Sequence, residues 1–394
     1  MSSISNDSIF WLNEVYYHQT FHCIIKYVMG ILKGENMKKI LSKDKTLHII
    51  TGAVIAVGAA LLTHFGNPKN MGFCIACFIR DTAGGMRFQN APAVQYVRPE
   101  IIGLILGSFI MAIIRKDFKP RSGSSPVLRF VIGAMVMMCA LVFLGCPLRM
   151  IIRLAGGDLN ALVALIGFVC GIFVGVVFLN KGISLGRADK RNLLEGVVAP
   201  ASQVILLILL LATPAIFVFS EKGPGSMRAP IYVSLIIALI IGALAELSRI
   251  CTAGSIRDLF LTRDYTLFLG PLTIFIVLLI INLVTGNFKF GFSNQPIAHS
   301  DHLWNLLSFF AVGLGSVMLG GCPLRQLILA GEGNGDSFIT MMGMFFGAAL
   351  SHNFNLAGVA GKGATTGGKV IVIISILFLV GTAWYIANRN SKEA

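Results

Sequence analysis

Apolar residues in this chain gather in long blocks that short polar segments separate. Ten blocks approach the roughly 20 residues that a helix needs to cross ~30 Å of hydrocarbon. The blocks are 47–66, 96–114, 126–145, 159–179, 198–219, 230–246, 265–285, 303–320, 337–351 and 370–387. The second and ninth are marginal, because their apolar cores are short. Lipid offers no hydrogen bonds to the backbone, so such blocks form helices. The pattern predicts an all-α polytopic membrane protein with about ten transmembrane helices.

The composition agrees with this class. Hydrophobic residues make up 55% of the 394 residues and charged residues only 13%, whereas a soluble domain carries about 25% charged residues. This balance argues against a disordered chain, a secreted disulfide scaffold and an ordinary soluble enzyme. Eight cysteines are too few for a disulfide scaffold, and several lie inside apolar blocks or beside Gly and Pro, so we interpret them as free thiols.

Basic residues predict how the helices are oriented. The net charge is +14, and most Lys and Arg residues lie between apolar blocks, which indicates an anionic membrane surface as partner and not a nucleic acid. Three clusters share one side when the chain start is placed in the cytoplasm: Lys38, Lys39, Lys43 and Lys45; Arg115, Lys116, Lys119 and Arg121; Lys181, Arg187, Lys190 and Arg191. Ten spans then leave both termini cytoplasmic.

The first residues are expected to lie outside the membrane. We assign 1–45 to a cytoplasmic, amphipathic and basic extension, in which no secretory signal peptide is evident. Met37 precedes the basic stretch and is a candidate start site. Residues 1–36 are then either an upstream extension or a peripheral amphipathic helix.

The chain contains an internal repeat. Two motifs recur in the same order, at offsets of about 176 residues: a Cys-x5-Arg-Asp segment and the pentapeptide Gly-Cys-Pro-Leu-Arg. The first copies span 74–81 and 145–149, and the second copies span 251–258 and 321–325. Each half holds five predicted spans, and an odd number inverts the second half relative to the first, a recurring transporter plan. We predict repeats at 46–220 and 221–388, followed by a cytoplasmic tail at 389–394.

The pentapeptide predicts the start of a helix. Pro147 and Pro323 suit the first helical turn, which places the preceding cysteine at the N-cap beside free N–H groups. The helix dipole and an arginine one turn later favour the thiolate there. Glycine before each cysteine permits a close approach of backbone or ligand. The pentapeptide residues with these assignments are Gly145, Cys146, Pro147, Arg149, Gly321, Cys322, Pro323 and Arg325.

The Cys-x5-Arg-Asp segments add a second pair of cations. Arg80 and Arg257 are costly inside a bilayer, so they should face protein, water or substrate. Asp81 and Asp258 are natural partners for them. These residues either hold the segments in shape or attract an anion, and the two roles are compatible.

Five cysteines are candidates for a substrate path. Cys139 and Cys170 lie within apolar spans and are interpreted as packed side chains. Cys77 lacks a repeat mate, because Gly254 occupies the matching position, and it fits either role. Cys74-x2-Cys77 also resembles half of a zinc or redox motif, but no second Cys-x2-Cys completes it, so we expect no metal and no cofactor. The path candidates are Cys74, Cys77, Cys146, Cys251 and Cys322.

From about Lys45 to its end, the chain resembles the YeeE/YedE family of membrane proteins. The resemblance rests on the paired pentapeptides, on Gly72–Asp81 and on Arg98–Gly103, and it is closest to the YedE branch described as selenium transporters. It implies an hourglass-like bacterial inner-membrane protein in which short broken helices carry cysteines along a narrow central path. In the thiosulfate branch, substrate passes between thiols through S–H···S hydrogen bonds. Sulfur-carrier proteins commonly accompany the family.

These observations predict a transporter and not an enzyme. A small selenium compound or thiosulfate-like anion would cross a central cysteine-lined pathway into the cytoplasm. Two alternatives stay open: a membrane thiol redox relay that uses Cys74 and Cys77, and a scaffold that docks a cytoplasmic sulfur- or selenium-carrier protein. The oligomeric state is not predicted.

Overall fold

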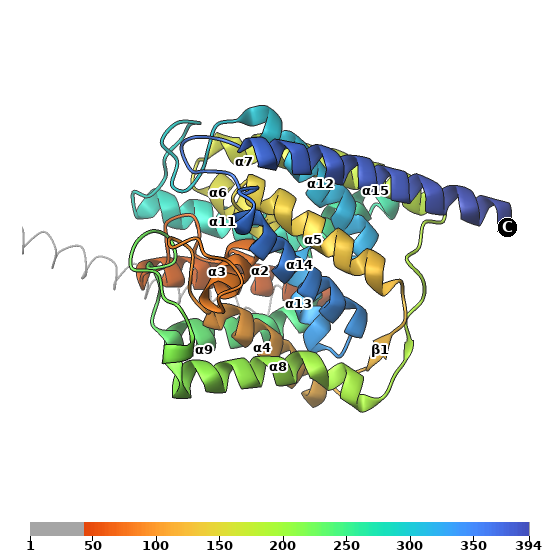
Figure 1. The fold of residues 1–394 in the computed structure, drawn as a ribbon, viewed down its shortest axis with the longest axis horizontal. Coiled ribbons are helices and arrows are strands. Elements are labelled where there is room, and N and C mark those ends of the chain that lie inside the picture. The colour runs from red at the N-terminus through yellow and green to blue at the C-terminus, as the bar shows by residue number, and fades with distance from the viewer. Residues whose placement is uncertain (1–42, 394) are drawn as a thin grey trace, which may run out of the picture.

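The computed structural model describes residues 43–393, which are mostly helical (Figure 1). The helices up to residue 212 are α2 Lys43–His64, α3 Ile75–Gly85, α4 Pro99–Ile114, α5 Pro126–Val142, α6 Pro147–Ala155, α7 Leu159–Asn180 and α8 Leu193–Ala212. The later helices are α9 Ile231–Ser248, α10 Thr252–Leu261, α11 Leu269–Val284, α12 His302–Leu319, α13 Pro323–Gly331, α14 Gly335–Asn353 and α15 Thr366–Glu393. The predictions for residues 1–36 lie outside the described residues.

Two very short strands and one 3₁₀ turn, η2 at Pro214–Ile216, complete the described secondary structure. Strand β1, Arg121–Ser122, pairs antiparallel with β2, Asp189–Lys190. This pairing joins the loop after α4 to the loop after α7. Two of the basic clusters therefore lie together at one end of the helices.

The helices agree with the predicted all-α membrane class. Within residues 43–393, seven segments are long and apolar enough to cross a membrane, and two shorter apolar helices, α4 and α11, accompany them. Each of the ten predicted blocks coincides with a helix, but α14 and the two shorter helices do not reach the length and hydropathy of the seven. Three of the seven segments combine a long helix with the short helix that follows it: α5 with α6, α9 with α10, and α12 with α13.

Closely packed helix pairs hold the bundle together. Helix α7 packs on α12, α5 on α14, α4 on α9 and α2 on α11. Glycines allow these backbones to approach, since a Cβ atom at Gly171 would collide with the carbonyl oxygen of Phe310, and one at Gly343 with that of Phe130. Small residues at helix contacts are the usual means of packing in lipid, where the hydrophobic effect gives no drive between helices.

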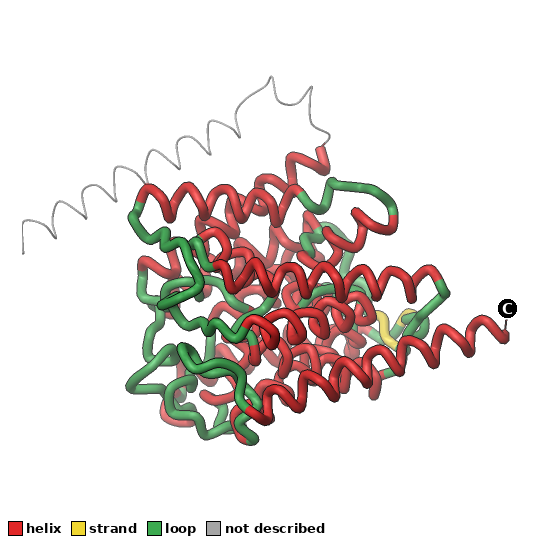
Figure 2. The backbone as a smooth tube through the Cα atoms, turned by 90° about the horizontal axis from the view of Figure 1, so that it is seen from above, coloured by secondary structure: helices red, strands yellow, loops and turns green. Residues whose placement is uncertain are grey.

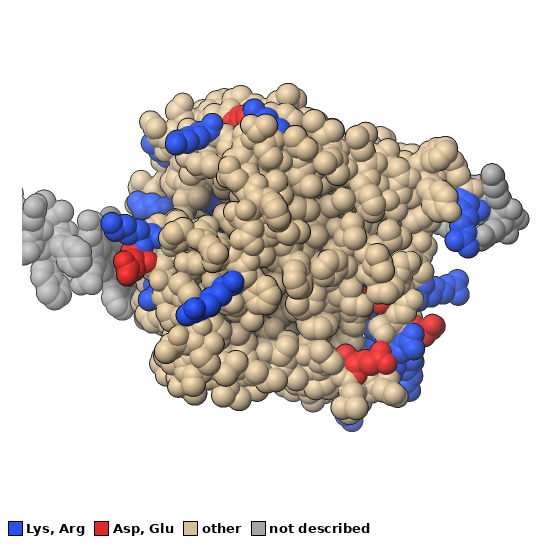
Figure 3. All heavy atoms as spheres, viewed as in Figure 1, with Lys and Arg blue, Asp and Glu red and all other residues tan. Residues whose placement is uncertain are grey.

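The outer surface suits a lipid environment. Large apolar side chains are exposed along α7, α8, α11 and α15. Charged residues are sparse on the face seen in Figure 3 and lie mostly toward its two ends, where the helices also end. The long helices run alongside one another, and most loops gather at their ends (Figure 2). On this face, the middle of the bundle is therefore almost uncharged.

The short helices lie inside this bundle and contact one another across the two halves of the chain. Helix α3 contacts α13, and α6 contacts α10. Helix α3 also packs on α14, and α10 packs on α7. These four short helices carry the two repeated motifs, so the fold brings the motifs of one half against those of the other.

Candidate functional site

Each of the four short helices begins at a cysteine. The N-cap residues are Cys74 for α3, Cys146 for α6, Cys251 for α10 and Cys322 for α13. Proline follows the cysteine in α6 and α13, as the pentapeptide predicts. At α3 and α10 the cysteine sulfur itself accepts an N–H bond from the first turn, from Cys77 and Gly254 respectively.

The first thiol cluster consists of Cys74, Cys77 and Cys146, which are all almost completely buried. The Cys74 sulfur accepts the Cys77 backbone N–H at 3.3 Å, and the Cys74 and Cys146 thiols lie within hydrogen-bonding reach of each other. The backbone N–H groups of Ala76 and Arg149, in the first turns of α3 and α6, lie near the Cys146 sulfur, which itself makes no side-chain cap hydrogen bond. The starts of α3 and α6 therefore meet at these sulfur atoms.

The second thiol cluster has the same plan. The Cys251 sulfur accepts the backbone N–H groups of Gly254 at 3.2 Å and Cys322 at 3.3 Å. The Cys322 sulfur lies within hydrogen-bonding reach of the Cys251 thiol and near backbone N–H groups in the first turns of both α10 and α13, although it makes no side-chain cap hydrogen bond. Two helix N-termini thus converge on one sulfur pair, an arrangement that stabilises negative charge on a thiolate or on a bound anion.

Arg149 is the cation of the first cluster, and it is fully buried. Its Nη1 donates to the Cys77 sulfur at 3.3 Å and to the carbonyl oxygen of Leu144. Its Nε donates to the carbonyl oxygen of Asn70 at 2.8 Å, and its Nη2 to that of Ile297 at 3.1 Å. Among the side chains of residues 44–389, no carboxylate pairs with this guanidinium.

Arg80 lies in a buried ion network and not in an open funnel. Its guanidinium pairs with Asp81 at 2.6 Å, and Asp81 also pairs with Arg98 at 2.8 Å. Arg98 lies 4.0 Å from Glu100. Because these side chains are buried and mutually neutralised, the structure gives Arg80 a structural position, whereas the sequence left an anion-attracting role open.

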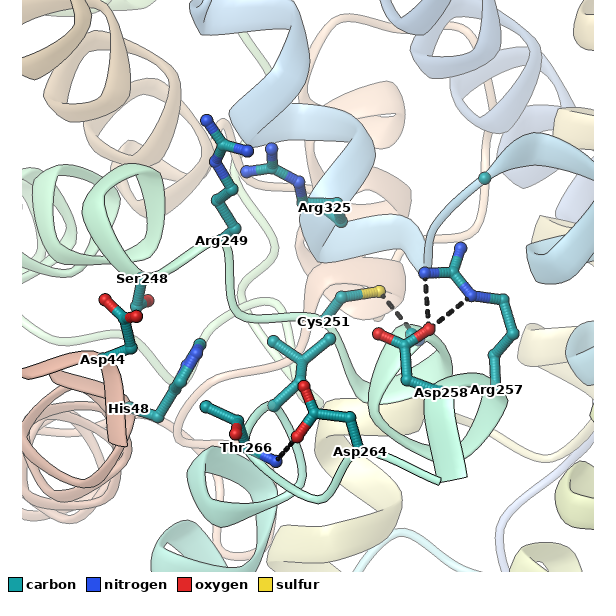
Figure 4. A pocket seen from close by; sticks show the side chains of 13 residues that line it. Asp44, His48, Ser248, Arg249, Cys251, Arg257, Asp258, Asp264, Thr266 and Arg325 are labelled. Atoms are coloured by element: carbon teal, nitrogen blue, oxygen red, sulfur yellow. Dashed lines mark hydrogen bonds and ion pairs between the residues drawn. The ribbon is translucent and has the colours of Figure 1, made fainter. Parts of the chain in front are cut away.

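The second half is more open. Arg257 pairs with Asp258 at 2.8 Å, and both side chains are about one-quarter exposed. Arg325 pairs with Glu332 at 2.8 Å. Both arginines line a cavity of about 400 Å³ whose wall includes Cys251 (Figure 4). Asp44 and His48, from the start of α2, lie on another side of this cavity.

Some residues of the interior differ from the sequence interpretation. Cys139 is buried, but Cys170 is exposed on the outer face of α7, so its interpretation as a packed side chain was wrong. The sequence did not single out the buried pair between Arg153 and Asp158, at 2.7 Å, although two opposite charges five residues apart beside an apolar span were a usable signal. Within the described residues, no group of three or more His, Cys, Asp or Glu residues is arranged to hold a metal ion.

The fold and site define a multi-pass helical membrane protein whose short internal helices present thiols in two buried clusters. Residues 247–394 match a family model described as sulphur transport. The resemblance to the YeeE/YedE family is thus confirmed over these residues, which include the second copies of both motifs. No curated protein matches the chain. The family match and the apolar helices together support a sulfur transporter.

Proposed function

We propose that the protein imports a small selenium- or sulfur-containing anion through a central path that its two thiol clusters line. One observation carries this proposal: in each cluster, two helix N-termini and two or more cysteine thiols converge at one point inside the bundle. Backbone N–H groups hold negative charge there without a counter-ion. Thiols add polarisable donors, which suit a chalcogen anion better than a hard oxyanion such as sulfate.

The proposed path runs between two inverted repeats, 46–220 and 221–388. By the order of the motifs, α3 corresponds to α10, α5 to α12, α6 to α13 and α7 to α14. When each helix is replaced by its counterpart, the contact of α3 with α13 becomes the contact of α10 with α6. The same exchange turns the packing of α7 on α12 into that of α14 on α5. These exchanged contacts support a two-fold relation between the halves, and substrate sites of inverted-repeat transporters lie at the repeat interface.

The basic residues give the orientation of the proposed path in the membrane. We place the face with β1 and β2 in the cytoplasm of a bacterial inner membrane, because two basic clusters meet there. Helix α2 also begins at this face in the ten-span topology, and Asp44 and His48 at its start line the 400 Å³ cavity. Substrate then meets the first cluster from outside, passes to Cys251 and Cys322, and leaves through that cavity.

Uptake tests this function. Cells that lack other importers would express the protein and receive radiolabelled thiosulfate, selenite or selenide. We expect uptake of at least one of these anions above that of the empty vector, and its loss in Cys146→Ala and Cys322→Ala. Cys170→Ala is the matched control, because this thiol is exposed on the outer face of α7. Uptake that survives both substitutions would reject the thiol path.

A further inference from the structure

A second cavity lies at the opposite end of α11 and α12 from the first. Its volume is about 490 Å³, and residues 292–301 of the connecting loop line most of it, together with Gly361 and Lys362. Helix α11 begins beside the first cavity, where Thr266 and Leu267 line the wall, and it ends at this loop. The two cavities therefore face opposite sides of the bundle.

The connecting loop separates this second cavity from the first thiol cluster. Gln295, Ala298 and His299 line the cavity, while the carbonyl oxygen of Ile297, between them, accepts a hydrogen bond from Arg149 Nη2. Arg149 in turn contacts the Cys77 sulfur. A single loop segment, 295–299, thus has the cavity at one side and the cation of the thiol cluster at the other.

This segment is strained where it contacts Arg149. Ile297 has a φ of 48°, a left-handed conformation that a β-branched residue rarely adopts. Such a conformation costs on the order of 1–3 kcal/mol and persists only where surrounding contacts hold it. Here the contacts are the Arg149 bond to Ile297, the bond from the Gly361 N–H to the Ala298 carbonyl oxygen at 2.8 Å, and that between His299 Nε2 and the Val142 carbonyl oxygen at 2.8 Å.

Charge distinguishes Arg149 from its repeat mate. Arg325 has Glu332 as a carboxylate partner, whereas the partners of Arg149 within the described residues are three carbonyl oxygens and one thiol. A buried cation without a counter-ion is unfavourable, and a hydrogen bond to an anion is about twice as strong as one to a neutral carbonyl. An anion would therefore replace one of these carbonyl oxygens readily.

We propose that Arg149 recognises the anionic substrate. Before the anion binds, the Ile297 carbonyl oxygen accepts the hydrogen bond from Arg149 Nη2 that the anion later accepts. This inference rests on the proposed function and names its substrate class, a small chalcogen-containing anion. An anion in the outer cavity displaces the carbonyl oxygen from Arg149, segment 295–299 loses the contact that holds its strained residue, and the cavity opens toward Cys77. No covalent bond changes in this step.

A reversible cross-link tests the proposal. The hydrogen bond from the Gly361 N–H to the Ala298 carbonyl oxygen, at 2.8 Å, places the two backbones side by side. A Cβ atom at Gly361 would meet open space, although the φ of 75° strains a side chain there. In the double variant Ala298→Cys with Gly361→Cys, oxidation would tie segment 295–299 to the neighbouring loop. We expect anion uptake to fall to background after oxidation and to return after reduction with dithiothreitol. In each single variant, oxidation and reduction should leave uptake at one level, because no cross-link can form. Equal uptake by the oxidised and reduced double variant would overturn the proposal.

A second measurement does not depend on transport. In the purified double variant, thiosulfate should slow formation of the cross-link at least threefold relative to chloride of equal ionic strength, because displacement of Ile297 separates the two loops. Adding Arg149→Lys should remove this difference, while Arg325→Lys should keep it. A cross-linking rate that thiosulfate leaves unchanged would refute the role of Arg149. If the unmodified protein took up none of the anions, the proposed function itself would fail.

Discussion

The pairing of Arg325 with Glu332 predicts how strongly the inner cavity attracts anions. Arg325 lines this cavity with Cys251, and its Nη1 lies 2.8 Å from the Glu332 carboxylate, with both side chains mostly buried. In Glu332→Gln, the carboxylate charge is lost and the Arg325 charge is no longer neutralised. We therefore expect anions, but not neutral molecules, to reach Cys251 more readily.

Coulomb's law sets the size of the effect. Two unit charges 4 Å apart interact by about 1 kcal/mol in water and about 4 kcal/mol at an effective dielectric constant of 20. The anion approaches Cys251 through the open cavity, where water screens its repulsion by the Glu332 carboxylate. We therefore expect a change of about 1 kcal/mol, which corresponds to a roughly fivefold change in rate. The fold should tolerate the change, since an amide keeps the shape of the side chain and can still accept from Arg325.

Thiol labelling measures this effect directly. The rate of Cys251 modification would be followed by mass spectrometry with a negatively charged and a neutral methanethiosulfonate, in a protein with Cys23 and Cys170 replaced by alanine. The ratio of the two rates should rise in Glu332→Gln. It should stay constant in Glu195→Gln, which removes an exposed carboxylate hydrogen-bonded to Ser122. An unchanged ratio in Glu332→Gln would refute this electrostatic account of the cavity.

Three further predictions concern stability. Gly171→Ala should lower stability by about 1–3 kcal/mol, because the new methyl group collides with the facing backbone, whereas Gly381→Ala meets open space and should be neutral in a thermal melt. Asp158→Asn should lower the free energy of unfolding by about 3–5 kcal/mol, because it leaves the fully buried Arg153 without a carboxylate partner. Asp258→Asn, which breaks the partly exposed pair with Arg257, should lower it by less than about 1 kcal/mol in the same melt. Burial lowers the pKa of His299 below its ordinary 6.5, so the unfolded chain takes up the proton more readily and stability should fall as the pH drops below 6.5. Melting curves between pH 5 and 8 should show a smaller fall for His299→Gln, and an identical fall would contradict this assignment.

The sequence predicted the parts of the site that local chemistry determines. The Cys-Pro pairs predicted where α6 and α13 begin, because proline favours the first helical turn. The recurrence of both motifs also indicated that four cysteines share one structural role. Each of these signals lies within a few residues of the feature that it predicts.

Features that depend on tertiary contacts could not be predicted in this way. The carbonyl oxygen of Ile297 is 148 residues from Arg149, and no local pattern marks it as a partner. Cys170 was assigned to the interior because its span is apolar on all sides. In lipid the outward face of a helix is as apolar as the inward face, so hydrophobic periodicity does not distinguish them.

The central claim is that the two thiol clusters form one path for a chalcogen anion. Measuring the flux of such an anion into proteoliposomes tests this claim most directly. The unmodified protein would be compared with a Cys146→Ser and Cys322→Ser double variant, because serine is a preferred N-cap residue and should preserve each helix start. We predict saturable uptake of labelled thiosulfate or selenite by the unmodified protein, and uptake at the level of empty liposomes by the double variant with an unchanged melting temperature. Equal flux through both proteins would contradict the account.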